Sequence, residues 1–142
     1  MQISSRFTIA IHTMLCIAAF QDKEKVTSTF IANSTHANPV VIRRILGQLK
    51  SAHLITVKAG IGGATITKPL DHITLLDLFQ AVQAVPKDFF AFHDNTNANC
   101  PVGENIHNIL DQYLANIQEA MNQEMKKTTL QTLFEQTKPY LK

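Results

Sequence analysis

The segment that most restricts the fold is a glycine-rich stretch between two short runs of β-branched residues. Residues 54–58 and 64–68 are rich in Ile, Thr and Val, and the sequence Ala-Gly-Ile-Gly-Gly lies between them at 59–63. Glycine adopts positive φ angles without steric cost, so such a stretch readily connects two antiparallel strands. The pattern therefore predicts a β-hairpin with a glycine-rich tip.

Two helices are predicted before this hairpin, near the start of the chain. Residues 3–20 carry apolar side chains at three- and four-residue steps, and Ser4 or Ser5 can serve as the N-cap. A polar stretch follows, after which Thr27 or Ser28 can cap a second, shorter helix. We therefore expect two separate helices rather than one long one.

A third helix is predicted from Pro39 to about Ala52. Asn38 is a preferred N-cap residue, and Pro fits the first helical position because its missing N–H would be unpaired there. Arg43 and Arg44 lie opposite the apolar side chains, which suits either a solvated surface or contact with an anionic partner. The apolar face consists of Val41, Ile42, Ile45, Leu46 and Leu49.

The net charge of +2 hides an asymmetry between two halves of the chain. Residues 1–68 carry eight Lys or Arg and two acidic residues, a net charge of +6. Residues 69–142 carry five basic and nine acidic residues, a net charge of −4. Because a basic surface attracts polyanions, we expect a polyanion partner for the first half only.

Three short helices followed by a hairpin are the elements of a winged helix-turn-helix, in which the third helix reads DNA and the hairpin is the wing. The predicted fold class is mainly α with a small β-hairpin wing, followed by a long C-terminal helix. We divide the chain into a DNA-binding domain at residues 1–84 and a second part at residues 85–142. The second part comprises a linker loop, a long dimerisation helix and a C-terminal helix.

The long helix is predicted from about Glu104 to Lys126, after a loop at residues 87–103. Before that loop, Thr74 and Asp77 resemble a capping box that opens a shorter helix. The long helix would extend for roughly 30 Å. It could fold back on the core, but pairing with a second subunit is favoured because a winged helix that reads a two-fold site needs a dimer. The predicted dimerisation residues are Ile106, Ile109, Leu110, Tyr113, Ile117 and Met121.

Composition excludes several classes of protein. A chain that is 45% hydrophobic and 17% charged can bury a core, so disorder is not its main state. A signal peptide is not expected, no run is long enough for a membrane helix, and two cysteines are too few for a disulfide framework. A cytoplasmic protein is expected. The motifs of enzymes, such as a nucleophile elbow or a P-loop, are absent, so an enzyme is not expected.

Several motifs, in order along the chain, resemble one family of bacterial regulators. They are Ser-Ser-Arg at 4–6, Asn-Pro-Val-Val-Ile-Arg-Arg at 38–44, the hairpin sequence at 54–64, Ile-Thr-Leu-Leu-Asp-Leu at 73–78 and Cys-Pro-Val-Gly at 100–103. Together they resemble the Rrf2 family of winged-helix transcription regulators, of the IscR, NsrR and CymR type, and most of all its YwnA-like branch. The resemblance implies a homodimer built on the long helix that binds a partly palindromic operator, usually as a repressor.

The resemblance also implies which residues contact DNA. They are Ser4, Ser5 and Arg6 at the first helix, Asn38, Val40, Arg43 and Arg44 on the recognition helix, and Lys58, Gly60, Gly62 and Gly63 in the wing. Helix N-termini bind phosphate, and Arg can form two hydrogen bonds with guanine in the major groove. The chain departs from the family at the wing, where Lys58-Ala59 and Ala64 replace an Arg-Gly pair and a Tyr.

The resemblance raises the question of an iron–sulfur cluster, which in this family is held by three closely spaced cysteines. Only Cys100 lies in the corresponding loop, so no cofactor is expected and no metal ligands are assigned. Some members of the family have an acidic residue as an additional cluster ligand. Thr8 occupies that position in this chain, and His12 lies one turn further along the helix. Cys100 could instead serve as a redox or effector thiol at the start of the long helix. The remaining alternative function is a winged-helix module for protein–protein contact.

Overall fold

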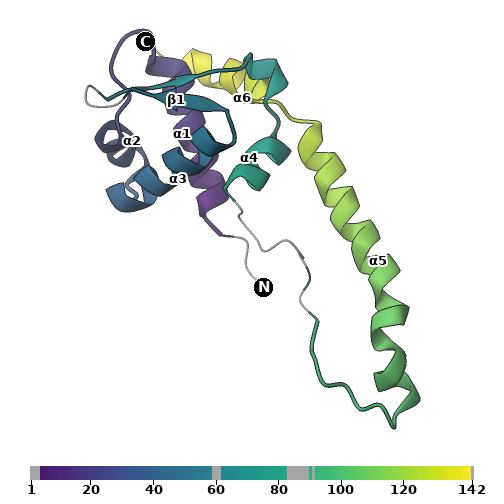
Figure 1. The fold of residues 1–142 in the computed structure, drawn as a ribbon. Coiled ribbons are helices and arrows are strands. Elements are labelled where there is room, and N and C mark those ends of the chain that lie inside the picture. Colours follow the sequence, from purple (N-terminus) through teal and green to yellow (C-terminus); the bar gives the residue numbers. More distant parts are fainter. Residues whose placement is uncertain (1–3, 59–61, 83–89, 91, 142) are drawn as a thin grey trace.

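The chain forms a helical body from which one long helix extends (Figure 1). A computed structural model describes residues 4–58, 62–82, 90 and 92–141. The elements are α1 (Arg6–Phe20), α2 (Ser28–Thr35), α3 (Pro39–Ser51), β1 (Ile55–Val57), β2 (Ala64–Ile66), η1 (Leu70–His72), α4 (Leu75–Ala81), α5 (Pro101–Lys126), α6 (Leu130–Thr137) and η2 (Lys138–Tyr140). Among the described residues, no helix is both long and apolar enough to cross a membrane.

The helix starts follow the chemistry of their capping residues. The Thr27 hydroxyl accepts a hydrogen bond from the N–H of Phe30 at 3.1 Å, and Asn38 Oδ1 accepts one from the N–H of Val40 at 2.8 Å. Pro39 stands in the first turn of α3, as predicted. At α1, Ser5 has the N-cap position but makes no side-chain cap hydrogen bond. The side-chain caps at Thr27 and Asn38 satisfy N–H groups that a helix cannot pair internally.

The hydrophobic core joins the first three helices to the hairpin and to α4. Met14 and Ile17 from α1, Ile45 and Leu49 from α3 and Leu78 from α4 are fully buried. Each large apolar side chain contributes about 1.5–3 kcal/mol when it leaves water. This core holds α3 rigidly by one face and leaves the opposite face to solvent.

The hairpin has the predicted position but shorter strands. β1 and β2 pair antiparallel, with Thr56 opposite Thr65, and each strand has three residues rather than the five predicted. Leu54 is not in β1 because its N–H bonds to the carbonyl of Leu49 and so completes the end of α3. Gly62 and Gly63 have φ angles of 72° and 104°, which confirms that the turn uses the conformational freedom of glycine.

The long helix begins earlier than predicted. α5 starts at Pro101, with Cys100 at the N-cap position, so the predicted start at Glu104 is wrong. The reason is the one that applies at Pro39: proline is compatible with the first helical position. The capping box at Thr74 and Asp77 is confirmed, with both of its hydrogen bonds present.

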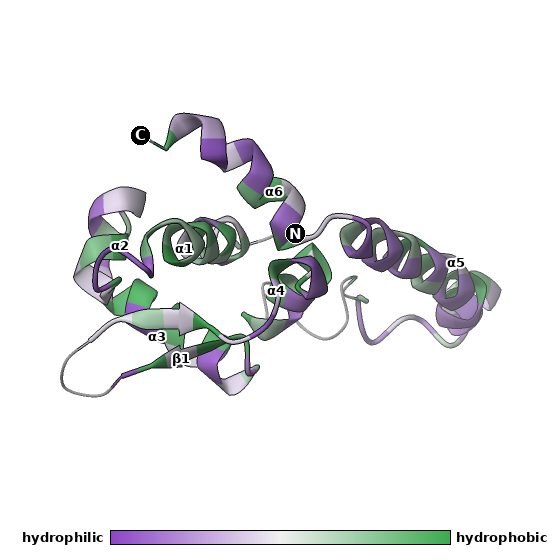
Figure 2. Ribbon diagram, turned by 90° about the horizontal axis from the view of Figure 1, so that it is seen from above, coloured by the Kyte–Doolittle hydropathy of each residue, from purple (hydrophilic) through white to green (hydrophobic). Residues whose placement is uncertain are grey.

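The last helix returns to the N-terminal body. Thr129 caps α6, and Leu130 is fully buried in the main core. The N–H of Leu130 bonds to the carbonyl of Ile73 at 2.7 Å, and the N–H of Leu75 bonds to that of Thr128 at 3.0 Å. α6 therefore lies beside η1 and α1, and the view from above shows it next to α1 (Figure 2). The division of the chain at residue 84 stays a prediction.

Candidate nucleic-acid interface

The outer face of α3 presents a continuous exposed surface. Ile42, Ile45, Leu46 and Leu49 are buried on the inner face, while Arg43 and Arg44 are exposed on the outer one. Val40 is 53% exposed at the start of the helix. The outer face therefore combines cationic groups with one apolar side chain, and both kinds of group can contact the edges of base pairs.

The cations on this surface are not neutralised by any residue that the structure describes. Arg43, Arg44, Lys50 and Lys58 form no ion pair and no side-chain hydrogen bond within the part of the chain that the structure describes. Lys50 was not among the predicted DNA contacts. Its spacing from Arg43 could have indicated it, because residues seven apart lie on the same face of a helix, about 10 Å apart along the axis.

Arg6 has a different environment from the other cations of the first half. Its side chain is half-buried, and its guanidinium donates a hydrogen bond to Gln48 Oε1 on α3. Its Nε is buried without a partner. Ser4 Oγ accepts a hydrogen bond from the Arg6 N–H at 3.1 Å. Arg6 therefore fixes the start of α1 to the recognition helix, and its contact with DNA stays a prediction.

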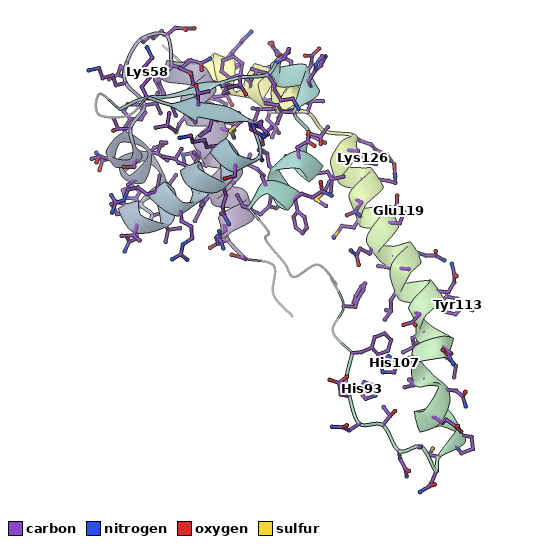
Figure 3. The ribbon with its side chains drawn as sticks, viewed as in Figure 1. Lys58, His93, His107, Tyr113, Glu119 and Lys126 are labelled. Carbon is purple, nitrogen blue, oxygen red and sulfur yellow. The ribbon has the colours of Figure 1, made fainter. Side chains whose placement is uncertain are left out.

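The wing is attached to the segment before α2. The N–H of Ala64 bonds to the carbonyl of Val26 at 3.0 Å, and a Cβ on Gly62 would lie 3.1 Å from Thr27 Cγ2. This close approach holds the hairpin beside α3. Lys58 is exposed at the end of β1, on the side of the body away from α5 (Figure 3). Gly60, a predicted contact, lies outside the described residues.

The predicted dimerisation residues have two kinds of environment. Ile109, Tyr113 and Ile117 are 50%, 66% and 53% exposed along the part of α5 that projects from the body (Figure 3). Ile106 and Leu110 are half-buried. Met121 lies nearer the end of the helix and packs against the chain's own core. The projecting part of α5 thus leaves an apolar face uncovered.

The two cysteines differ in acidity because their surroundings differ. The pKa of the Cys100 thiol is lowered by the backbone N–H groups of Gly103 and Val102 at the start of α5, although its sulfur makes no cap hydrogen bond. Burial raises the pKa of Cys16, which lies inside the body, and a hydrogen bond with Ser34 offsets part of that effect. The thiolate form is therefore favoured at Cys100 and disfavoured at Cys16.

A recognition helix with a free cationic face, beside a hairpin wing, defines the class of winged helix-turn-helix DNA-binding proteins. The Rrf2 family model, described as "Iron-dependent Transcriptional regulator", matches residues 3–136, and the chain belongs to this family. The members of this family are transcription regulators, and DNA binding is the activity that they have in common. The predicted family and fold class are confirmed.

Individual relatives agree with this assignment. The chain is 41% identical over 128 residues to "Putative HTH-type transcriptional regulator YwnA" of Bacillus subtilis (strain 168), a match that covers 90% of this chain and 93% of that protein. A solved structure described as "Crystal structure of a putative DNA binding protein" is 36% identical with a TM-score of 0.71, covering 91% of this chain and 98% of the other. Oxidized CymR of Staphylococcus aureus shares the fold, with a TM-score of 0.68 at 19% identity over 95% of this chain and 97% of its own.

The family description raises the question of an iron site. The described residues contain no group of three or more His, Cys, Asp or Glu side chains placed to hold a metal ion. Cys100 stands at the N-cap position of α5, and Cys16 is buried in α1. His12 Nε2 is 2.8 Å from Ser34 Oγ, and Thr8 donates to the Ser5 carbonyl. These donors do not fit a cluster that needs several thiolates from one loop.

Proposed function

We propose that the chain is a homodimeric, sequence-specific DNA-binding repressor of the bacterial cytoplasm that works without the three-cysteine iron–sulfur site. The observation that carries the proposal is the outer face of α3, where cations without partners among the described residues stand on a helix held by a buried apolar stripe. A positive, rigid helix beside a wing matches the charge and groove dimensions of duplex DNA. The chain's two cysteines support the absence of a three-cysteine site.

Within this proposal the residues of α3 have distinct roles. Arg43 and Arg44 reach guanine edges or phosphates, and Val40 contacts thymine methyl groups in the major groove. Asn38 already uses its side-chain oxygen as the cap of α3, so its contribution to DNA is the oriented N-terminus of the helix. Lys58 and the wing glycines contact the neighbouring backbone, where the lack of a Cβ permits close approach.

The test is selection of binding sites from random duplex DNA by the purified full chain, followed by affinity measurements on the selected site. We expect Arg43→Ala to weaken specific binding by roughly 1–3 kcal/mol if it reads a base. Lys126→Ala, an exposed lysine on α5, is the matched control and should leave affinity unchanged. If Arg43→Ala binds the selected DNA as tightly as the wild type does, and also binds random DNA as the wild type does, then α3 is not the helix that reads the sequence.

The same measurements distinguish a sequence-specific DNA-binding protein from a winged-helix module that serves protein–protein contact. Binding that rests on phosphate contacts alone fades steeply as the salt concentration rises. A chain that retains no DNA at physiological salt and enriches no sequence would therefore favour the alternative. Repression is tested by placing the selected site in a promoter, where the protein should lower transcription.

Homodimerisation is proposed through the exposed apolar face of α5. The paired variant Tyr113→Glu with Ile117→Glu should sediment as a monomer, because it places charges on the face that a partner would cover. Ala115→Glu is the control, since residue 115 points to the other side of the helix. A dimer that persists in the paired variant would exclude the α5 interface.

A second candidate function, a thiol switch, is favoured by the backbone N–H donors that lower the pKa of Cys100. At neutral pH we expect a thiol reagent to modify Cys100 before the buried Cys16, measured by mass spectrometry of peptides. An oxidant should then change the DNA affinity of the wild type and not that of Cys100→Ser. Equal responses of the two proteins would eliminate this role.

A further inference from the structure

A cavity of about 390 Å³ lies between the recognition helix and the wing. Its walls come from the outer face of α3, the segment that enters α2, the end of β1 and the hairpin residues 62–64. The Ala64–Val26 hydrogen bond closes one side by holding the hairpin to the chain before α2. Small-molecule pockets commonly have volumes of about 300–1,000 Å³, so this space is large enough for a compact ligand.

The inner walls of this cavity are aliphatic. Val26, Leu46 and Ala64 are 1%, 7% and 2% exposed and form the deepest part, and the half-buried Val57 lies beside them. Water gains little from such walls because they offer it few hydrogen bonds. An occupant with an apolar body would pack against these walls and would remove from water the surface that Val57 still exposes, and such burial is the main source of affinity in concave sites.

The outer part of the cavity is cationic. Arg43 and Lys50 line it from α3, and neither forms an ion pair with a described residue. None of the described residues that line it is acidic. The hydroxyl-bearing residue Ser28 also lines it, at the first residue of α2, where the helix presents unpaired N–H groups. This part of the cavity is therefore suited to a negative group.

A glycine on the recognition helix keeps the cavity open. Gly47 lies between Arg43 and Lys50 on the same face of α3, and a Cβ built on it meets nothing within 4 Å. Glycine inside a helix is less favourable than alanine. No neighbouring atom in the structure requires glycine at this position, so the consequence of having glycine here is the open space itself.

We infer that this cavity binds a small organic anion with an apolar body, whose negative group pairs with Arg43 and Lys50 and whose body packs on Val57 beside the walls formed by Val26, Leu46 and Ala64. A phosphate of the DNA backbone would satisfy the cations and leave the aliphatic walls uncovered. The combination of an aliphatic interior with a cationic mouth matches an amphipathic ligand better than a bare phosphate.

Occupation of the cavity would oppose DNA binding, and this part of the inference rests on the proposed function. Arg43 faces the cavity and is also the residue proposed to read a base, so it cannot pair with both partners at once. The ligand would also fill the space between α3 and the wing, through which a DNA backbone passes from one groove to the next. The ligand thus acts as an inducer, and by linkage DNA weakens the ligand to the same degree.

The site is tested first without DNA, by titrating the purified full chain and following its backbone amide signals by NMR. The probes are 3-phenylpropionate, its neutral amide and inorganic phosphate. We expect 3-phenylpropionate to bind with a roughly millimolar or tighter dissociation constant and to shift signals around Gly47, Gly63 and Ala64. The amide and phosphate should each bind about tenfold more weakly, since each lacks one of the two contacts.

Two pairs of variants locate the binding site. Gly47→Leu fills the cavity and should abolish the shifts, whereas Ser51→Leu places the same side chain on α3 outside it and should retain them. Arg43→Gln should weaken 3-phenylpropionate by about tenfold, and Arg44→Gln, which does not line the cavity, should not. Binding that survives Gly47→Leu, or phosphate binding equal to that of 3-phenylpropionate, would overturn the assignment.

The regulatory part is tested with DNA selected as described above. At a ligand concentration ten times its dissociation constant, the apparent DNA affinity of the wild type should fall by about tenfold. Ligand binding with unchanged DNA affinity would overturn the competition and leave the cavity as a binding site. Ligand binding by a protein that binds no DNA would contradict the proposed function alone. Absence of ligand binding by a protein that binds DNA would contradict this inference alone.

Discussion

Two amphipathic helices of this protein begin with the same kind of residue but lie in different surroundings. α3 and α5 both carry proline in their first turn, and both have an apolar stripe along one side. Of the 13 residues of α3, four are buried, whereas none of the 26 residues of α5 is buried. An apolar stripe therefore predicts that a helix will be covered and leaves open whether its own chain or a second chain covers it.

The charged side chains of the two regions also differ, because those near the C-terminus have partners in the protein and the arginines of α3 do not have them among the described residues. Exposed carboxylates near the C-terminus have lysine partners close by, at 2.9 Å for Lys127 with Glu124 and 3.0 Å for Lys138 with Glu135. The hydrogen bond from Lys138 lowers the pKa of Glu135. The arginines of α3 have no such partners among the described residues. Local pairing is typical of a solvated surface, and its lack on α3 leaves charge available for a polyanion.

The largest expected difference between the helices concerns their apolar residues. Leu49→Ala should lower the free energy of unfolding by about 2–5 kcal/mol, because Leu49 is fully buried and its removal leaves a cavity. Ile109→Ala on α5 should have a much smaller effect on the dilute protein, since Ile109 is 50% exposed. Urea denaturation at two protein concentrations measures both. An equal loss at low concentration would show that α5 is covered within one chain.

A medium effect is expected at the helix starts. Asn38→Ala removes the hydrogen bond to the Val40 N–H and should cost about 1 kcal/mol of stability. Cys100→Ala is the matched change at α5 and should cost less, because Cys100 makes no side-chain cap hydrogen bond. Thermal unfolding of both variants compares them. A larger loss at Cys100 would show that its sulfur stabilises α5 more than its geometry indicates.

The smallest expected effects have opposite signs. Gly47→Ala should raise stability by about 0.5–1 kcal/mol, because its Cβ enters open space and alanine favours a helix. Gly103→Ala should lower stability, because its Cβ would lie 2.6 Å from the Asn97 carbonyl oxygen. Denaturant midpoints of the two variants provide the measurement. Stabilisation by both changes would mean that the turn before α5 adapts to a side chain at residue 103.

Local chemistry could be predicted from the sequence, and long-range contacts could not. The caps at Asn38 and Thr74, and one at Thr27 or Ser28, were predicted because the capping side chain and its N–H lie within three residues of each other. The start of α5 at Pro101 obeys the same rule and was missed because the loop was extended through it. No local pattern indicates the hydrogen bond from Arg6 to Gln48, which lies 42 residues further along the chain.

The candidate site was predictable to a similar extent. The period of α3 places its arginines on the exposed face, and the structure agrees. The cavity beside them depends on how closely the hairpin approaches α2, which is set by the Ala64–Val26 hydrogen bond and by the small size of Gly62. Such a distance results from packing of the whole body, so helical and strand periodicity contain no information about it.

The backbone hydrogen bonds that join Leu130 to Ile73 and Leu75 to Thr128 have a consequence for the choice of operator. They fasten the chain that leaves α5 to the body that carries α3, so the body is fixed at a set angle on the end of the long helix. In a dimer held by α5, that angle determines how far apart the two α3 helices stand. DNA presents successive major grooves on one side about 34 Å apart. In the proposed dimer, the short pairing between residues 73–75 and 128–130 would thus set which spacing of half-sites the two subunits can span.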